Sequence, residues 1–180
     1  MDRRVFMQSA VAAGVSAAAV PALAAKFAAL TEVSGSISAV TGSRSAIEIE
    51  QAAVQELSDS LRGNLLMPGN PGYDTARRVL NGGIDRHPAF VVQPVGATDI
   101  RKAVTFARDR DLLLAVKCGG HSYAGKSTCD GGLQIDLSTF RHARVDAKNR
   151  VAHVAGGSLL GEIDRESMAV GLVTTAGTVS

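Results

Sequence analysis

The stretch Lys-Cys-Gly-Gly-His-Ser-Tyr-Ala-Gly at residues 117–125 decides how the fold is interpreted. It follows the apolar run Leu-Leu-Leu-Ala-Val at residues 112–116, whose length and composition predict a buried strand. Two adjacent glycines allow a positive φ and let successive backbone N–H groups converge on one anion, most often a phosphate. The imidazole that comes next can act as a nucleophile near neutral pH. The stretch therefore predicts a phosphate-binding loop that carries a nucleophile.

Two nucleotide-binding patterns can be compared with this loop. Residues 120–127, Gly-His-Ser-Tyr-Ala-Gly-Lys-Ser, match the P-loop pattern of NTPases. A P-loop functions only where a helix begins at its Lys-Ser, because the helix N-terminus faces the phosphates. Residues 128–132 instead predict a turn and residues 133–137 a strand, which disfavours an NTPase. No two glycines of the chain are separated by a single residue, so the Rossmann dinucleotide fingerprint is excluded.

The loop and the segment that follows it resemble a known flavoprotein family. Residues 116–125 and 129–138 resemble the first FAD-binding segment of the berberine bridge enzyme-like oxidases, in the vanillyl-alcohol oxidase (p-cresol methylhydroxylase, PCMH) superfamily. The resemblance implies FAD as cofactor and an α+β (α/β) fold, with residues 89–180 forming the first, truncated part of a PCMH-type FAD-binding domain. In that family the histidine of Gly-Gly-His is joined covalently to the 8-methyl carbon of the flavin, a role that falls on His121; a histidine that only caps the loop is the alternative. The cofactor-binding residues that the resemblance implies are Cys118, Gly119, Gly120, His121, Ser122, Tyr123, Gly125, Gly177 and Thr178.

The same resemblance implies an activity. Family members remove a hydride from an alcohol or amine carbon of a small molecule, such as a sugar or secondary metabolite, and dioxygen or another acceptor reoxidises the flavin. The chain does not reveal the general base. Val179 stands at or next to the place where some relatives carry a second flavin-linking cysteine, so attachment is expected through His121 alone. The alternative is a non-catalytic, truncated remnant that binds flavin weakly or not at all.

The N-terminus predicts export. Asp2-Arg3-Arg4 precedes an alanine-rich apolar segment and a small-x-small cleavage site at residues 22–24, so residues 1–25 resemble a twin-arginine signal peptide. A retained transmembrane anchor is the alternative, but alanine and glycine contribute little transfer free energy. The predicted location is therefore periplasmic or extracellular, with membrane contact only through the signal. Residues 26–45 predict a flexible linker.

Composition excludes some partners. The formal net charge of +2, without a run of basic residues, argues against nucleic acid, and the absence of tryptophan removes a stacking platform. Two cysteines and scattered histidines give no metal-site spacing. Cys118 and Cys129 could pair in an oxidising compartment, although small, buried free thiols also fit beside the glycines and are favoured.

Hydrophobic spacing predicts the elements before the loop. Residues 46–88 form a helical entry segment, with an amphipathic helix from Ala46 to near Gly63 and a short helix at 73–81. A strand at 89–93 and the strand at 112–116 enclose a helix at 99–110, which makes a βαβ unit with the two strands as parallel neighbours. Thr98 is the expected N-cap of that helix. Its expected inner face holds Ile100, Val104 and Ala107.

Further elements are predicted after the loop. Beyond the strand at 133–137, residues 142–146 and 150–155 predict a β-hairpin. Ser158 is expected to cap a helix at 159–170 that Gly171 ends. Its expected inward residues are Leu160, Ile163 and Met168, whereas His87, His142 and His153 are expected in loops or on outward faces.

Overall fold

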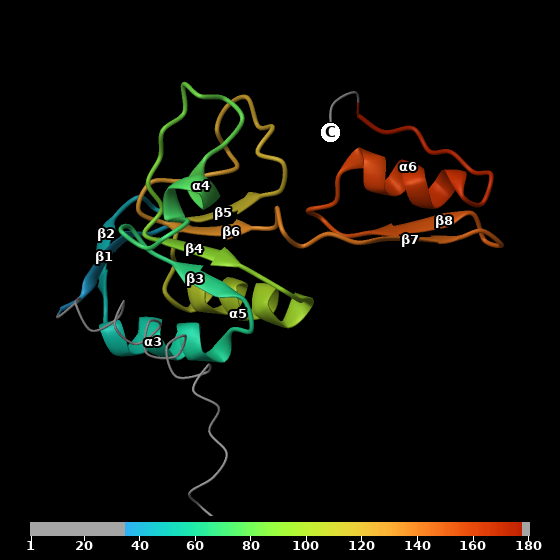
Figure 1. Cartoon of the computed structure of the whole chain (residues 1–180). Coiled ribbons are helices and arrows are strands. Elements are labelled where there is room, and N and C mark those ends of the chain that lie inside the picture. Colours follow the sequence, from blue (N-terminus) through green and yellow to red (C-terminus); the bar gives the residue numbers. More distant parts are fainter. Residues whose placement is uncertain (1–34, 178–180) are drawn as a thin grey trace, which may run out of the picture. The chain divides into compact units, whose positions relative to one another are not determined.

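The computed structural model of the chain describes residues 35–177. The predicted export signal at residues 1–25, the first part of the predicted linker, and Thr178 with Val179 lie outside the described residues. The described part mixes helices and strands, in agreement with the predicted α+β class (Figure 1).

A four-stranded sheet in the order β3-β4-β6-β5 carries the fold (Figure 1). Strands β4 (Phe90–Gln93), β5 (Leu114–Lys117) and β6 (Leu133–Asp136) run parallel, and β3 (Asn64–Leu66) pairs antiparallel with β4. The apolar, β-branched composition of β4 and β6 fits strands that are covered on both faces. The most completely buried apolar side chains of the sheet are Phe90, Val91, Val92, Leu133 and Ile135.

The expected pairing of β4 with β5 is wrong, because β6 lies between them. Gln134 of β6 pairs with Val91 on one side and with Ala115 on the other. All four residues of β6 are buried, which suits the central position, whereas Leu114 and Val116 of β5 are exposed on the edge strand. Both βαβ strands remain parallel to β6, so the glycine loop still follows the carboxyl end of a parallel strand.

Helices cover both faces of this sheet (Figure 1). On one face lie α3 (Gln51–Ser60) and α5 (Ala97–Asp109), and the ring of Phe106 packs edge-on against Phe90 with a centroid distance of 6.1 Å. On the other face lies the short helix α4 (Tyr73–Arg77), whose Tyr73 and Ala76 form a buried cluster with Val91.

Helix α5 begins earlier than predicted and buries a different face. Its N-cap is Gly96, not Thr98. Of the three residues expected on one face, Ala107 is buried and Ile100 is half-buried, but Val104 is 41% exposed. The physical reason is Asp99, which is buried and pulls its side of the first turn inward. Its carboxylate accepts hydrogen bonds from the backbone N–H groups of Arg62, Gly63 and Val95 at 3.0–3.1 Å. The buried residues of α5 are Asp99, Ala103, Phe106 and Ala107.

Two strands replace the predicted end of the linker and the predicted first turn of the helix. β1 (Ile37–Val40) and β2 (Ala46–Ile49) form an antiparallel hairpin, and α3 begins only after it. The alternation Ile-Glu-Ile at 47–49 has the period of a strand, and the exposed Glu48 separates a half-buried from a buried isoleucine. Backbone hydrogen bonds join Val40 to Gly131 and to Leu113, so the hairpin continues the packed part of the chain.

The last elements follow the prediction closely. β7 (Ala143–Asp146) and β8 (Val151–Val154) form the expected hairpin, and α6 (Leu160–Met168) comes next. Two details are wrong. Ser158 does not cap α6: its hydroxyl donates to the carbonyl of His142, and the side chain of Glu162 accepts from the Leu159 N–H instead. Met168 is 73% exposed because it lies in the last turn. His87, His142 and His153 are exposed, as expected.

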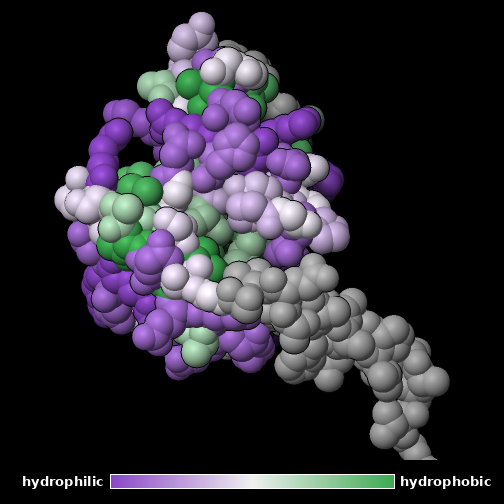
Figure 2. Space-filling view, turned by 90° about the vertical axis from the view of Figure 1, so that its left-hand side faces the viewer, coloured by the Kyte–Doolittle hydropathy of each residue, from purple (hydrophilic) through white to green (hydrophobic). Residues whose placement is uncertain are grey.

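Hydrophilic residues cover most of the face drawn in Figure 2, with small apolar patches between them. Among the described residues, no helix is both long enough and apolar enough to span a bilayer.

Candidate functional site

The glycine loop leaves the carboxyl end of β5 and adopts a conformation that excludes larger residues. Gly120 has a φ of +71°, and a Cβ placed there would lie 3.2 Å from Val79 Cα. A Cβ at Gly119 would lie 2.8 Å from His121 Cε1. The glycine pair is therefore required both by backbone conformation and by close approach. The ring of His121 is exposed to solvent.

His121 borders a cavity of about 340 Å³. Of the predicted site residues, this cavity brings together Cys118, Gly119 and His121. Gly120 is buried between them and does not line the cavity, and neither do Ser122, Tyr123, Gly125 and Gly177. The other lining residues come from the end of β5 and from three neighbouring segments: Lys117, then Arg78, Val79, Leu80, Ser138, Arg141, Gly157 and Leu159.

The cavity offers groups that bind anions. Within residues 35–177, the backbone N–H groups of Gly119, Gly120 and His121 form no hydrogen bond with any other group of the chain. Arg78 and Arg141 line the same cavity, and Arg141 Nε donates to the carbonyl of Ser138 at 2.6 Å. Unpaired successive amides together with fixed positive charge are the features of a phosphate-binding site.

A segment upstream in the sequence supports the loop, and sequence reasoning missed its role. The N–H of Leu80 donates to the carbonyl of Gly120 at 3.1 Å, and Asn81 Nδ2 donates to the carbonyl of Tyr123 at 3.1 Å. A Cβ at Gly125, whose φ is +71°, would lie 2.9 Å from a methyl carbon of Ile84. This region was predicted as part of a short helix at 73–81. Helix α4 ends at Arg77, and the Asn-Gly-Gly at 81–83 was the signal that a loop follows.

Arg86 holds the far side of the loop. Its Nη1 donates to the carbonyl oxygens of Gly125 and Thr128, each at 3.1 Å, and its Nε lies 3.9 Å from Asp130 Oδ2. Inside the loop, Ser122 Oγ accepts from the Lys126 N–H at 3.0 Å. Ser122 and Gly125 therefore shape the loop.

Comparison with known proteins identifies the family to which the chain belongs. Residues 88–179 match the family described as FAD binding domain. The chain belongs to this FAD-binding family.

Three related proteins illustrate the match. The chain is 29% identical to (R)-6-hydroxynicotine oxidase from Paenarthrobacter nicotinovorans, over 66% of this chain and 26% of the relative. It is 33% identical to an FAD-linked oxidoreductase from Dictyostelium discoideum, over 71% of this chain and 28% of the relative. A structure of glucooligosaccharide oxidase from Acremonium strictum, which concerns a 6-S-cysteinyl, 8α-N1-histidyl FAD, matches with a TM-score of 0.57 and 26% identity, over 66% of this chain and 24% of that one. The chain thus spans about a quarter of the length of these relatives.

The residues of this FAD-binding domain fit the cofactor. The diphosphate of FAD needs several hydrogen-bond donors and positive charge, and the unpaired amides at 119–121 and the nearby residues Arg78 and Arg141 are groups of these kinds. The exposed imidazole of His121 borders the same cavity. FAD is the cofactor that the family match and the named relatives support.

The structure argues against the P-loop alternative. Lys126 and Ser127 lie in a turn, and β6 is the next regular element. No helix N-terminus therefore faces a phosphate bound by these residues. Among the described residues, no group of three or more His, Cys, Asp or Glu side chains could hold a metal ion.

The two cysteines of the FAD-binding domain are free thiols. Cys129 is 3% exposed, and burial raises the pKa of its thiol to about 11. Burial and, secondarily, the charge of Asp136 raise the pKa of the half-buried Cys118 thiol. Neither environment favours a reactive thiolate, so Cys118 contributes to the cavity as a small neutral side chain.

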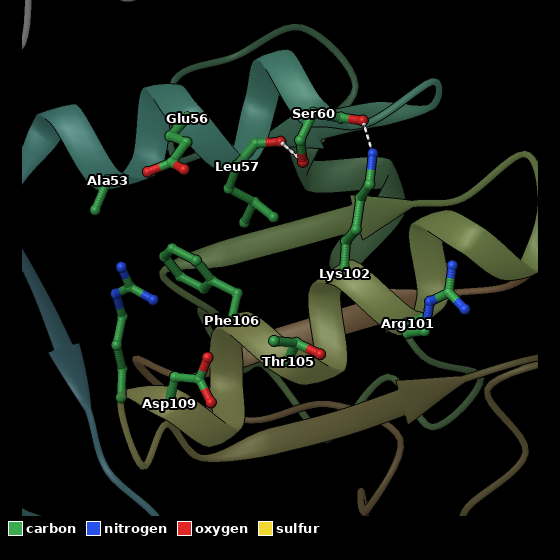
Figure 3. Close-up of a pocket in the computed structure, with 10 residues that line it drawn as sticks. Ala53, Glu56, Leu57, Ser60, Arg101, Lys102, Thr105, Phe106 and Asp109 are labelled. Atoms are coloured by element: carbon green, nitrogen blue, oxygen red, sulfur yellow. Dashed lines mark hydrogen bonds between the residues drawn. The ribbon is translucent and has the colours of Figure 1, made fainter.

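A larger cavity of about 410 Å³ lies between α3 and α5 (Figure 3). Leu57 and Phe106 point toward each other at its base, Lys102 Nζ donates to the carbonyl of Ser60, and the Arg110 guanidinium lies 4.0 Å from the Phe106 ring centroid. None of the predicted site residues lines it. Glu56, Arg101 and Asp109 of this cavity are exposed, and its half-buried cations Lys102 and Arg110 already contact Ser60 and Phe106. The smaller cavity beside His121 is therefore the candidate cofactor site.

Proposed function

We propose that this chain is the amino-terminal part of an FAD-dependent oxidoreductase whose flavin is attached covalently through His121. The observation that carries the proposal is the exposed residue His121 at the border of a cavity that Gly119, Arg78 and Arg141 also line. The histidyl FAD of the related glucooligosaccharide oxidase supports it.

In this proposal the chain's own groups hold the cofactor in two ways. The N–H groups of Gly119, Gly120 and His121 donate to the diphosphate, and Arg78 and Arg141 balance its charge. The segment that contains Gly177 and Thr178 supplies a second contact with the flavin; Gly177 is exposed, and Thr178 lies outside the described residues.

Attachment requires His121 to present a ring nitrogen to the 8-methyl carbon of the flavin. An N–C bond replaces one C–H bond of that methyl group and the N–H bond of the imidazole. The two protons and two electrons released would pass through the bound flavin to dioxygen and form hydrogen peroxide. The bond prevents loss of the cofactor outside the cell.

The proposed reaction is oxidation of a small molecule at an alcohol or amine carbon. When bound, FAD accepts the hydride and passes the electrons to dioxygen or another acceptor. The names of the relatives support this class: one is a hydroxynicotine oxidase and another a glucooligosaccharide oxidase. No feature of the described residues points to a general base, and substrate choice lies with residues beyond this chain's share of its relatives.

We also propose that residues 1–25 direct export by the twin-arginine route. The Arg3-Arg4 pair before an alanine-rich segment supports this. Replacing both arginines by lysine should retain the folded protein in the cytoplasm, whereas unchanged export of that variant would contradict the proposal.

Peptide mapping tests the attachment. Trypsin cleaves after Lys117 and Lys126, so it releases residues 118–126 with His121 as their only histidine. The full-length protein carrying these residues, expressed with FAD and digested after denaturation, should yield this peptide with the mass of one FAD added. A peptide of unmodified mass from fully flavin-loaded protein would contradict the proposal. It would favour the alternative of a domain that holds flavin without a covalent bond.

A further inference from the structure

A buried ion pair joins the two strands that end beneath the flavin loop. Lys117 closes β5 and Asp136 closes β6, and the two residues are direct partners in the parallel register. Lys117 Nζ lies 3.3 Å from Asp136 Oδ1, and the residues are only 6% and 1% exposed. A pair so deeply buried is unusual, because both charges are removed from water and loss of either partner leaves the other charge buried without compensation.

The pair is the centre of a wider polar network. Lys117 Nζ also donates to the carbonyl of Ala76 in α4, and Gln134 Nε2 donates to the same carbonyl at 2.9 Å. Asp136 accepts from Gln93 Nε2 and from the backbone N–H of Ser138, each at 3.1 Å. Three parallel strands, one helix and the start of the next loop therefore meet at one pair of charges.

The walls of the His121 cavity begin at this network. Lys117 directly precedes the Cys-Gly-Gly-His segment, and Asp136 holds Ser138, which lines the cavity with Arg141. Ala76 lies just before the segment at 78–80, which lines a third wall and carries Gly120 through the Leu80 N–H. The network thus fixes where three wall segments start relative to one another.

We propose that the Lys117–Asp136 pair positions His121 for its bond to the flavin, an inference that rests on the proposed function. Lys117 also lines the His121 cavity, but neither side chain of the pair reacts with flavin or substrate in this proposal. The pair acts through the three segments that it anchors, so both residues are positioning residues and not reacting groups. A displacement of the reacting atoms by about 1 Å is enough to slow a reaction roughly 100-fold.

Stability and positioning can be separated because apolar pairs often replace buried ion pairs without loss of stability. Lys117→Met alone leaves the carboxylate of Asp136 buried without its cation and should destabilise the fold. Lys117→Met combined with Asp136→Val removes both charges and should recover most of the lost stability. The double variant still lacks the hydrogen bonds to Ala76 and Ser138, so the wall segments lose their common anchor.

The experiment measures covalent attachment in the full-length protein. Flavin-free protein is mixed with FAD, and the fraction of flavin retained after denaturation is followed with time, below the unfolding midpoint of every variant. The double variant should attach flavin at least about tenfold more slowly than the wild type, although its unfolding midpoint is close to the wild-type value. Lys117→Arg, which keeps the charge and can reach both partners, should attach at near the wild-type rate.

Asp99→Asn is the matched control, because Asp99 is another buried carboxylate bonded to backbone N–H groups, but it lies at the start of α5. Asp99→Asn should lower the unfolding midpoint. Its attachment rate should stay within about twofold of the wild-type rate, which corresponds to a change of only ~0.4 kcal/mol in the activation free energy. Attachment by the double variant at the wild-type rate would overturn the positioning proposal, and so would equal slowing by Asp99→Asn. A wild-type protein that attaches no flavin would overturn the proposed function itself, and the positioning role with it.

Discussion

The backbone N–H of Leu80 donates a hydrogen bond to the carbonyl oxygen of Gly120 at 3.1 Å. The residue before the proposed attachment histidine is thus held by a segment that precedes the whole βαβ unit in the sequence. The shape of the loop depends on this contact and on the left-handed backbone of Gly120, whose φ is +71°.

Gly120→Ala should therefore damage the site more than the fold. A Cβ at this position would lie 3.2 Å from Val79 Cα and 3.4 Å from the Leu80 nitrogen, in a backbone conformation that costs a non-glycine residue about 1–2 kcal/mol. We expect a modest loss in the free energy of unfolding and the loss of most covalent flavin, measured by urea denaturation and by flavin retained in the denatured protein. Gly161→Ala in α6, where a Cβ would meet nothing within 4 Å, is the control and should leave both unchanged or slightly improved. Equal flavin retention by both variants would contradict this account of Gly120.

Arg86→Met should loosen the loop on its far side. One guanidinium nitrogen holds the carbonyl oxygens of Gly125 and Thr128, and methionine offers no donor in its place. The exposed Lys126 should then be cleaved by trypsin several-fold faster under native conditions, as followed by mass spectrometry. Arg101→Met, on the surface of α5, is the comparison variant. Cleavage at Lys126 that stays at the wild-type rate in Arg86→Met would show that this side chain does not restrain the loop.

Asp99 should make the stability of the fold depend on acid pH. Burial disfavours its charged form, but hydrogen bonds from the N–H groups of Arg62, Val95 and Gly63 outweigh burial and hold the pKa of Asp99 below its usual range. A carboxyl group with a lowered pKa in the folded state stabilises the protein above its unfolded pKa. That stability is lost as the pH falls through the folded value.

Asp99→Asn should therefore lower the free energy of unfolding at pH 7 by about 2 kcal/mol, because it leaves buried N–H groups without an anionic acceptor. Below about pH 4, the wild type should lose stability more steeply than the variant as the pH falls. Urea denaturation at several pH values from neutral to acid measures how steeply the free energy of unfolding changes with pH in each protein. Parallel slopes for the two proteins would rule out Asp99 as a source of the acid dependence.

The two thiols should react with iodoacetamide at different rates. Burial raises the pKa of the Cys129 thiol to about 11, so it stays protonated at pH 8, and it is also shielded from reagent. The half-buried Cys118 should be labelled first, and bound FAD should slow its labelling because Cys118 lines the cavity. Mass spectrometry of native and denatured samples reports both sites. A Cys118–Cys129 disulfide in protein prepared without reductant would contradict the free-thiol arrangement.

Local patterns in the sequence predicted much of this structure. The apolar run at 133–137, the hairpin around residues 147–149 and the Gly171 helix stop each have a short-range cause, and all are present in the structure. The glycine–histidine loop was recognised from its local sequence, although its conformation also depends on contacts from Leu80, Asn81 and Arg86.

Long-range contacts explain the errors. The insertion of β6 between β4 and β5 depends on which strand buries most surface, which no window around either strand reveals. The buried face of α5 was misjudged because Asp99, a polar residue, is buried. Its carboxylate accepts hydrogen bonds from three backbone N–H groups outside the helix. The role of Arg86 was missed because its partners, Gly125 and Thr128, lie far away in the sequence.

The central claim concerns the bond between His121 and the flavin, and one measurement tests it most directly. Full-length protein and its His121→Ala variant are loaded with FAD, denatured and precipitated, and the flavin in the pellet is measured by its absorbance. The wild type is predicted to keep its flavin in the pellet, and His121→Ala to release all of it into the supernatant. Free flavin from the wild type, or covalent flavin in His121→Ala, would contradict the account.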